Sequence, residues 1–156
     1  MPGIVVIADT REQEAYTFDP SRIATVRKAL PAGDYSLAGL EGRVAVERKS
    51  LEDLIDTVIR DRGRFERELT RLSTCEAACV VVEGNLSDVL DHRYRSGAHP
   101  ASVLGSVIAI IVDHQVPVFF CGDRATARAF VERYLLRFHK KVSQVCRTLP
   151  SAAPTP

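Results

Sequence analysis

The sequence predicts an α/β fold with a mixed sheet. Short apolar runs rich in β-branched residues alternate with segments whose apolar residues recur every three or four positions. This alternation is typical of strands and helices stacked in layers. Two of the predicted strands, residues 34–37 and 43–49, are joined by a short connection with turn residues. So short a link makes this pair antiparallel, and the sheet therefore cannot be wholly parallel.

The first part of the chain is predicted to contain a strand and a helix. Residues 4–8 form a short β-branched run that indicates a buried strand. Residues 21–30 have helical character because Ile23, Val26 and Leu30 fall on one face, and the following proline ends the helix. The antiparallel pair comes next along the chain.

Two helical pieces are expected after the antiparallel pair. Ser50 is a suitable N-cap for a helix whose apolar face runs through residues 51–59. Gly63 is expected to interrupt this helix, and the apolar spacing over residues 65–72 indicates a second piece.

The second half continues the alternation. Its elements are predicted to be a strand at 79–83, a buried helix at 101–114, a strand at 116–121 and a long amphipathic helix at 123–145. The length of 156 residues fits one domain. We expect that domain to cover residues 1–147, before a disordered Pro-rich tail at 148–156.

Composition excludes several classes of protein. Hydrophobic residues make up 46% and charged residues 26%, which is typical of a globular domain. No apolar run is long enough to span a bilayer, and no basic region precedes the first apolar stretch. We therefore expect no membrane partner and a cytoplasmic location, associated with the nucleoid if the source is bacterial.

The cysteines and the net charge are weakly informative. The cysteine spacing matches no zinc pattern, so reduced and mostly buried thiols are expected. These residues are Cys75, Cys79, Cys121 and Cys146. The formal net charge of +1 indicates no nucleic-acid partner by itself, and the local clustering of basic residues matters more than their sum.

Acids and a lysine occur together in the antiparallel pair. Side chains alternate along a strand, so Glu47 and Lys49 share one face while Arg48 takes the other. Asp34 stands at the near end of the partner strand and can reach the same point as Glu47. Converging carboxylates suit a hard cation such as Mg²⁺, and a lysine beside it suits charge that develops on phosphate. The pattern indicates metal-assisted phosphodiester cleavage.

Further acids can join this site. Asp9, at the end of its own strand, is a candidate ligand or can position a metal-bound water, and Asp53 can act from outside the ligand set. The backbone carbonyl of Arg48 is a candidate third ligand. Each element also has an ordinary interpretation, as a turn, a solvated charge run or a helix cap. The combination favours a site, because Glu47 and Lys49 end an otherwise apolar strand.

These residues resemble a known family signature. The pattern Gly33-Asp34…Glu47-Arg48-Lys49-x-x-x-Asp53 resembles the G-D-x(n)-E-R-K-x-x-x-D motif of the XPF-type structure-specific DNA endonucleases, the ERCC-four domain family. The run from Asp9 to Glu12 looks like that family's opening D-x-R-E element. The similarity extends over most of residues 4–140.

The resemblance implies a fold, a cofactor and a substrate. The fold would be restriction-endonuclease-like, a three-layer α/β/α core around the mixed sheet. The cofactor would be Mg²⁺ or Mn²⁺, and the partner would be branched, forked or flapped duplex DNA. By position, Asp34 and Glu47 correspond to metal-binding acids and Lys49 to the catalytic lysine. The other motif positions, with roles left open, are Asp9, Arg11, Arg48 and Asp53.

Two basic segments are candidate DNA contacts. We favour phosphate contacts over a solvated helix surface for the arginines that crowd around Gly63, because Arg can bind phosphate in bidentate geometry. These are Arg60, Arg62, Arg64, Arg67 and Arg71. The loop at 92–97, with Arg93 and Arg95, could touch the backbone or stack a base, or be an ordinary exposed loop.

Two rival functions and an assembly stay open. A catalytically silent scaffold that docks a nuclease or grips DNA is known in the resembled family, but this chain retains all the motif acids. A nucleotide-binding protein is disfavoured because neither a G-x-G-x-x-G nor a Walker-type motif is present. The apolar helices of the second half are expected to be core, and the resemblance adds a homodimer through the nuclease domain. Family members commonly continue into a helix-hairpin-helix module, so the choice of DNA structure stays open here.

Overall fold

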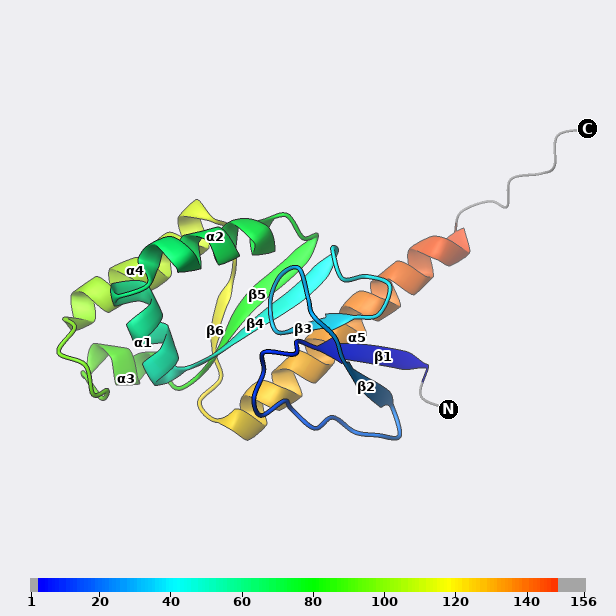
Figure 1. Cartoon of the computed structure of the whole chain (residues 1–156), viewed down its shortest axis with the longest axis horizontal. Coiled ribbons are helices and arrows are strands. Elements are labelled where there is room, and N and C mark those ends of the chain that lie inside the picture. The colour runs from blue at the N-terminus through cyan, green and yellow to red at the C-terminus, as the bar shows by residue number, and fades with distance from the viewer. Residues whose placement is uncertain (1–2, 149–156) are drawn as a thin grey trace, which may run out of the picture.

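The computed structural model describes residues 3–148 and contains a six-stranded sheet within them. The strands are β1 (Ile4–Ala8), β2 (Ile23–Arg27), β3 (Tyr35–Leu37), β4 (Val44–Ser50), β5 (Ala77–Glu83) and β6 (Val118–Phe120). The helices are α1 (Leu51–Ile59), α2 (Arg62–Ser73), α3 (Leu86–Leu90), α4 (Pro100–Asp113) and α5 (Arg124–Thr148). The first four elements are strands, and the predicted alternation of strands with helices holds from β4 onward (Figure 1).

The sheet is mixed, as predicted. Its strand order is β2-β1-β3-β4-β5-β6. β3 runs antiparallel to both β1 and β4, and the other pairs are parallel. The carboxyl ends of β1, β4 and β5 therefore lie at the same edge of the sheet as the amino end of β3. This geometry brings segments together that are far apart in the sequence.

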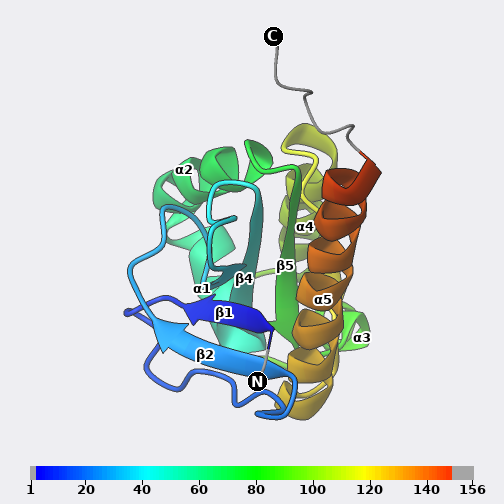
Figure 2. The same cartoon turned by 90° about the vertical axis from the view of Figure 1, so that its right-hand side faces the viewer.

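Helices cover both faces of the sheet, which confirms the three-layer α/β/α architecture. α5 lies along one face, while α1, α2 and α4 lie on the other (Figures 1 and 2). The core is correspondingly split in two. Val46 and Leu135 belong to the cluster under α5, and Ala45 and Leu69 to the cluster under α1, α2 and α4. The alternation along β4 decides which face each of its side chains meets.

The helix predicted at residues 21–30 is wrong, because Ile23–Arg27 forms the edge strand β2. This strand pairs in parallel with β1, with Ile23 opposite Ile4 and Val26 opposite Ile7. Three of its five residues are β-branched, which suits a pleated strand better than a helix. The helical spacing was misleading, because an edge strand leaves Val26 exposed and does not need alternating apolar residues.

Other boundaries differ in detail. Gly63 lies inside α2, and the break between the two helices falls at Arg60 and Asp61 instead. The predicted cap is confirmed: the Ser50 side chain accepts a hydrogen bond of 3.1 Å from the Asp53 backbone nitrogen. The short helix α3 was not predicted, because its single turn is too brief to show a period.

Three large apolar side chains on α4 are exposed, so the expectation of a buried helix was wrong in part. Ile108, Ile111 and Val112 are 49%, 41% and 65% exposed. No helix within residues 3–148 is long and apolar enough to cross a membrane. The predicted disordered tail lies, apart from Thr148, outside the described residues.

The four cysteines are free thiols, as predicted, but they are less buried than expected. Only Cys79 is fully buried; Cys75 and Cys121 are half-buried and Cys146 is exposed.

Candidate active site

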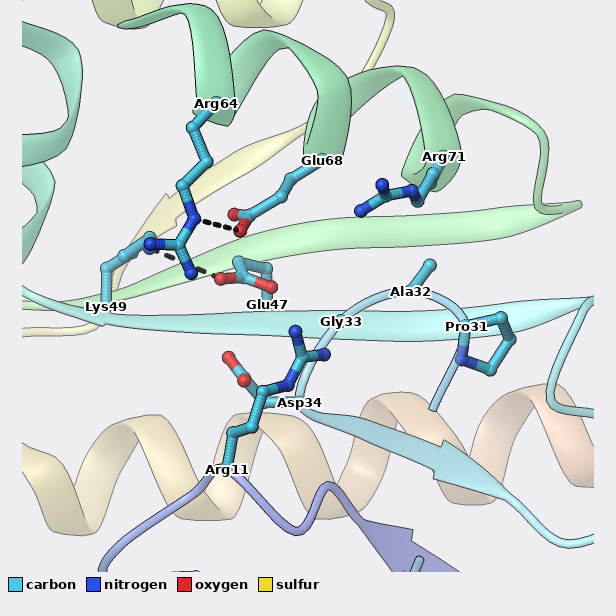
Figure 3. A pocket seen from close by; sticks show the side chains of 10 residues that line it. All are labelled: Arg11, Pro31, Ala32, Gly33, Asp34, Glu47, Lys49, Arg64, Glu68 and Arg71. Atoms are coloured by element: carbon cyan, nitrogen blue, oxygen red, sulfur yellow. Dashed lines mark ion pairs between the residues drawn. The ribbon is translucent and has the colours of Figure 1, made fainter. Parts of the chain in front are cut away.

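A pocket of about 180 Å³ opens at the edge of the sheet where β1 and β4 end and β3 begins. Figure 3 shows Asp34 and Glu47 facing one another across it, with Lys49 near one end. The pocket lies between this edge and α2. The structure thus brings together the two acids and the lysine that the sequence singled out.

Gly33 permits Asp34 to approach β4 closely. Its φ of +71° lies in the left-handed region, and an added Cβ would stand 3.0 Å from the Val46 carbonyl oxygen and 3.2 Å from the Ala45 Cβ. The Asp34 backbone nitrogen donates to that same carbonyl at 2.8 Å. In addition, Asp34 Oδ2 accepts a hydrogen bond of 2.8 Å from the Arg48 backbone nitrogen. Asp34 is therefore fixed to β4 by its backbone and by its side chain.

Glu47 and Lys49 form the other wall of the pocket and pair with each other. Glu47 is 8% exposed, and its Oε1 lies 3.3 Å from Lys49 Nζ. The ammonium group also lies 5.2 Å from the centre of the Phe65 ring on α2. An ammonium above an aromatic face is held by the ring quadrupole. Glu47 and Phe65 thus orient the Lys49 side chain, which still lines the pocket.

The two acids are electrostatically strained without a cation. Burial is the main cause that raises the pKa of Asp34 above its usual range, despite the opposing hydrogen bond from Arg48. Burial also raises the pKa of Glu47, and the nearby charge of Asp34 adds to this effect, while Lys49 opposes it. Such a pair favours either a shared proton or a bound positive charge.

Arg48 lies on the opposite face of β4, as strand alternation predicted. Its guanidinium donates from Nε to Glu12 Oε2 at 2.8 Å and from Nη1 to Glu83 Oε1 at 2.7 Å. Tyr35 and Tyr16 donate their hydroxyls to the same two carboxylates, at 2.9 and 3.0 Å. This network ties β3, β4, β5 and the loop after β1 together, and the backbone nitrogen of Arg48 connects it to Asp34 in the pocket.

Asp9 holds Arg11 and does not line the pocket. Its side chain is 0% exposed, and Oδ2 accepts hydrogen bonds from the backbone nitrogen and Nε of Arg11 at 3.1 and 2.6 Å. Its Oδ1 accepts from the Leu30 backbone nitrogen at 2.8 Å. Burial raises the pKa of Asp9, but these hydrogen bonds outweigh it and lower the pKa overall. Arg11 lines the pocket and is exposed, and Figure 3 shows its guanidinium reaching toward the space between Asp34 and Glu47.

The remaining predicted residues are placed as follows. Asp53 is exposed at the start of α1 and does not line the pocket. Of the predicted arginines, Arg64 and Arg71 line the pocket, while Arg93 is paired to Asp88 and Asp91 at 2.8 and 2.7 Å. The others are exposed and lie away from the pocket lining: Arg60, Arg62, Arg67 and Arg95.

Comparisons with known proteins decide the family. A family model described as the ERCC4 domain matches residues 8–134, which is most of the chain. The chain belongs to the ERCC4 domain family. This confirms the resemblance that the signature residues indicated.

Individual relatives of this ERCC4 domain are larger proteins. It is 31% identical over 117 residues to MJ1505 of Methanocaldococcus jannaschii, whose name describes an ATP-dependent RNA helicase. It is 26% identical over 119 residues to the 3′-flap repair endonuclease Xpf of Saccharolobus solfataricus. These matches cover 75% and 74% of this chain but only 13% and 46% of the two relatives.

Solved structures confirm the fold. XPF from Aeropyrum pernix matches with a TM-score of 0.69 at 23% identity, over 92% of this chain and 69% of that one. The same protein in a complex with DNA matches with a TM-score of 0.66 at 24% identity, over 96% of this chain and 76% of the other. The ERCC4 domain described here therefore has the nuclease-domain fold of these proteins.

Sequence reasoning missed Glu68, the third carboxylate that lines the pocket. It stands on α2 with its Oε1 3.7 Å from Arg64 Nε, and its charge contributes to the raised pKa of Glu47. Helical spacing could have found it, because positions 64, 68 and 71 share one face of α2, beside the buried Phe65. Glu12 and Glu83 were not predicted as partners of Arg48, because nothing in the local pattern shows a contact 35 residues away.

The pocket offers a divalent cation few side-chain ligands. Within residues 3–148, no group of three or more His, Cys, Asp or Glu side chains is arranged to hold a metal ion. Asp34 and Glu47 alone still fit Mg²⁺, which keeps several waters and is commonly bound through one or two carboxylates together with substrate phosphates. The pKa values of both acids are raised, which means that their ionised forms are unfavourable here. A cation between them would stabilise these ionised forms.

Proposed function

We propose that this ERCC4 domain is a divalent-metal-dependent DNA endonuclease that hydrolyses phosphodiester bonds. One observation carries the proposal: two poorly compensated carboxylates, Asp34 and Glu47, meet a lysine in an open pocket at the edge of the sheet. The names of the relatives support DNA as the substrate, because one is a 3′-flap repair endonuclease and another was solved with DNA. Branched, forked or flapped duplexes are the substrates that we propose.

Asp34 and Glu47 would hold the metal, Mg²⁺ or Mn²⁺. When bound there, the ion would polarise the scissile phosphate and lower the pKa of an attacking water. The carboxylates must be ionised for this role, and their raised pKa values make that state costly in the absence of the ion. Metal binding and ionisation of the acids are therefore coupled.

Lys49 and Arg11 would stabilise negative charge from two sides. Lys49 is held beside Glu47 and can orient the water or neutralise charge that develops on phosphate. Arg11 is held at its Nε by the buried Asp9, so its two Nη groups are left to bind a phosphate. This geometry favours a positioning role for Asp9 over the ligand role that the sequence suggested. Arg48 would contribute indirectly, because its backbone nitrogen donates a hydrogen bond that positions the Asp34 carboxylate.

The arginines of α2 would guide the DNA backbone. Arg64 stands at the pocket, and its ion pair with Glu68 at 3.7 Å is loose enough to be exchanged for a phosphate. The exposed side chains farther out would add non-specific phosphate contacts. These are Arg60, Arg62, Arg67, Arg93 and Arg95.

Labelled substrates would test the function directly. The purified protein is incubated with fork, 3′-flap, nicked and linear duplexes, with and without Mg²⁺ or Mn²⁺. We expect cutting near the branch only when metal is present, and no cutting by Glu47→Gln. A scaffold that binds DNA without cutting is the rival. Equal products from wild type and Glu47→Gln, or no cutting of any substrate with either metal, would rule out the endonuclease.

We also propose that the domain forms a homodimer through α4. Ile108, Ile111 and Val112 make an exposed apolar stripe on this helix, which an aqueous surface does not favour. A second copy could cover the stripe symmetrically. Sedimentation of the wild type should give a dimer and Ile111→Glu a monomer, with unchanged circular dichroism. A monomeric wild type at micromolar concentration would contradict this assembly.

A further inference from the structure

A second pocket adjoins the active-site pocket along α2. It has a volume of about 380 Å³ and shares Pro31, Ala32 and Arg71 with the first pocket. Figure 3 shows these three residues together at the end of the active-site pocket that lies away from Lys49. The two pockets therefore form one groove, bounded by α2 on one side and by the chain before β3 on the other.

The second pocket offers few polar groups to a ligand. The hydroxyls of Thr70 and Thr74 donate to carbonyls of their own helix, at 2.9 and 2.6 Å. Glu41 is the one carboxylate in the lining, and it is neutralised by Lys28 at 3.5 Å. Pro31, Ala32 and Cys75 contribute apolar or weakly polar atoms. A flat, uncharged group therefore fits this space better than a phosphate does.

Arg71 stands where the two pockets join and has no partner among the described residues. Within residues 3–148 its side chain makes neither an ion pair nor a hydrogen bond, whereas Arg62 and Arg64 on the same helix pair with glutamates at 3.7 Å. An uncompensated guanidinium can bind a phosphate and can also stack on the face of a base. Both interactions are available from this one position.

We propose that the second pocket binds the base of an unpaired nucleotide next to the scissile phosphate, with Arg71 on the phosphate of that nucleotide. This inference rests on the proposed function, because it takes the Asp34–Glu47 pocket as the place of cleavage. The volume lies in the range of roughly 300–1,000 Å³ found for small-ligand pockets. A base that is still paired would first have to leave the duplex at a cost of a few kcal/mol. The pocket would therefore select DNA that is unpaired beside the cut.

Alkylation of Cys75 would report occupancy of the pocket without any cleavage. Cys75 lines the pocket and is half-buried, while Cys146 is exposed on α5 and serves as the internal reference. The Glu47→Gln variant is treated with N-ethylmaleimide in the presence of flap DNA, and both cysteines are followed by mass spectrometry. We expect the DNA to slow alkylation of Cys75 and not of Cys146.

An abasic substrate identifies the group that fills the pocket. Removing the base from the unpaired nucleotide at the cut should abolish protection of Cys75 and weaken binding about 10-fold, because the apolar contacts of the base with the pocket are lost. Removing a base far along the flap should change neither measurement. Equal protection by the intact and abasic strands would overturn the proposal, because the pocket would then be covered by backbone alone.

Filling the pocket provides the matched variant. An added Cβ at Gly42 meets no atom within 4 Å, so Gly42→Leu can extend a side chain at the pocket without disturbing the backbone packing. We expect this variant to bind intact and abasic flaps equally, and we expect Arg71→Ala to bind both flaps more weakly because it loses the phosphate contact. Gly3→Leu, also at an open position, and Arg133→Ala on α5 should keep the 10-fold preference of the wild type. A full preference in Gly42→Leu would overturn the assignment.

The two proposals fail in distinguishable ways. Base recognition is measured by alkylation and binding, so it can be established even if the protein cuts no DNA. Conversely, an abasic site can be placed at each of the three nucleotides on either side of the cut. If none of these sites changes metal-dependent cutting, the nuclease proposal holds and the base-binding proposal is contradicted.

Discussion

The charged residues on the two faces of β4 differ in how fully neighbouring groups of opposite charge compensate them. On the face under α5, Arg48 is enclosed by Glu12 and Glu83, and two tyrosine hydroxyls complete the bonding of those carboxylates. On the face under α2, Lys49 is the one ion-pair partner of Glu47 within residues 3–148, and Glu47 faces a second acid. The first face is internally compensated and the second is not.

The difference distinguishes charged residues that stabilise the fold from charged residues that are available to bind a ligand. Buried ions that satisfy each other gain nothing from a ligand, so the Arg48 network can hold strands together but cannot bind substrate. Acids whose ionisation is opposed by burial, and for Glu47 also by the charge of Asp34, gain free energy when a cation binds between them. We therefore propose that the three consecutive charged residues of this motif have two different roles, which strand alternation separates onto the two faces of β4. The following experiments test this division, from the largest expected effect to the smallest.

Removing either acid should abolish cleavage. Asp34→Asn or Glu47→Gln should lower the cleavage rate at least about 1,000-fold, because metal catalysis contributes several kcal/mol to such reactions. Thermal unfolding without metal should show equal or higher stability at about pH 8, because a repelling charge has been removed. Retained metal-dependent nicking would show that the uncompensated face is not the catalytic one.

The same substitution at two adjacent residues should give opposite results. Arg48→Met deprives two largely buried carboxylates of the guanidinium that they share and should cost about 3 kcal/mol, or roughly 6–12 °C in Tm. Lys49→Met should change stability by less than about 1 kcal/mol and lower turnover about 100-fold or more. Adding Glu12→Gln to Arg48→Met should recover part of the lost stability. Similar stability losses for Arg48→Met and Lys49→Met would contradict the assignment of a structural role to Arg48 alone.

Stability without metal should depend on pH through the uncompensated face. Folded-state pKa values raised above the unfolded values mean that the folded protein binds more protons in this range. Its free energy of unfolding should therefore be highest near about pH 5 and fall as the pH rises toward about 8. Mg²⁺ should restore stability at the higher pH. Urea unfolding with chelator measures this, and Glu47→Gln should flatten the profile; a profile that rises with pH would contradict the assignment.

Asp9 should affect DNA binding more than metal binding. Asp9→Asn keeps an oxygen for Leu30 but loses the charge that holds Arg11, so KM for DNA should rise about 10-fold with metal affinity unchanged. Arg11→Ala should give a similar rise. Calorimetric titration with Mn²⁺ supplies the second measurement, and a loss of Mn²⁺ affinity in Asp9→Asn would identify Asp9 as a ligand after all.

The sequence was most informative where a local rule applied. Alternation placed Glu47, Arg48 and Lys49 on their correct faces, and the short turn correctly predicted an antiparallel partner that carries Asp34. The segment at 21–30 was misjudged, because its helical spacing arose in an edge strand whose identity depends on pairing with β1. The Arg48 network and the groove beside Arg71 were out of reach, since both depend on contacts between distant parts of the chain.

The hairpin of β3 and β4 has a consequence for how ERCC4 domains with this arrangement can diversify. Its open end carries Asp34 and Glu47, while its turn supplies Glu41 and Gly42 to the second pocket. Antiparallel pairing fixes the acids from the strand side, so the spacer between the two halves of the signature can change in length without moving them. We expect insertions in this turn to change the preference for DNA structure without affecting the proposed cleavage site. The turn is therefore a suitable place to engineer substrate preference.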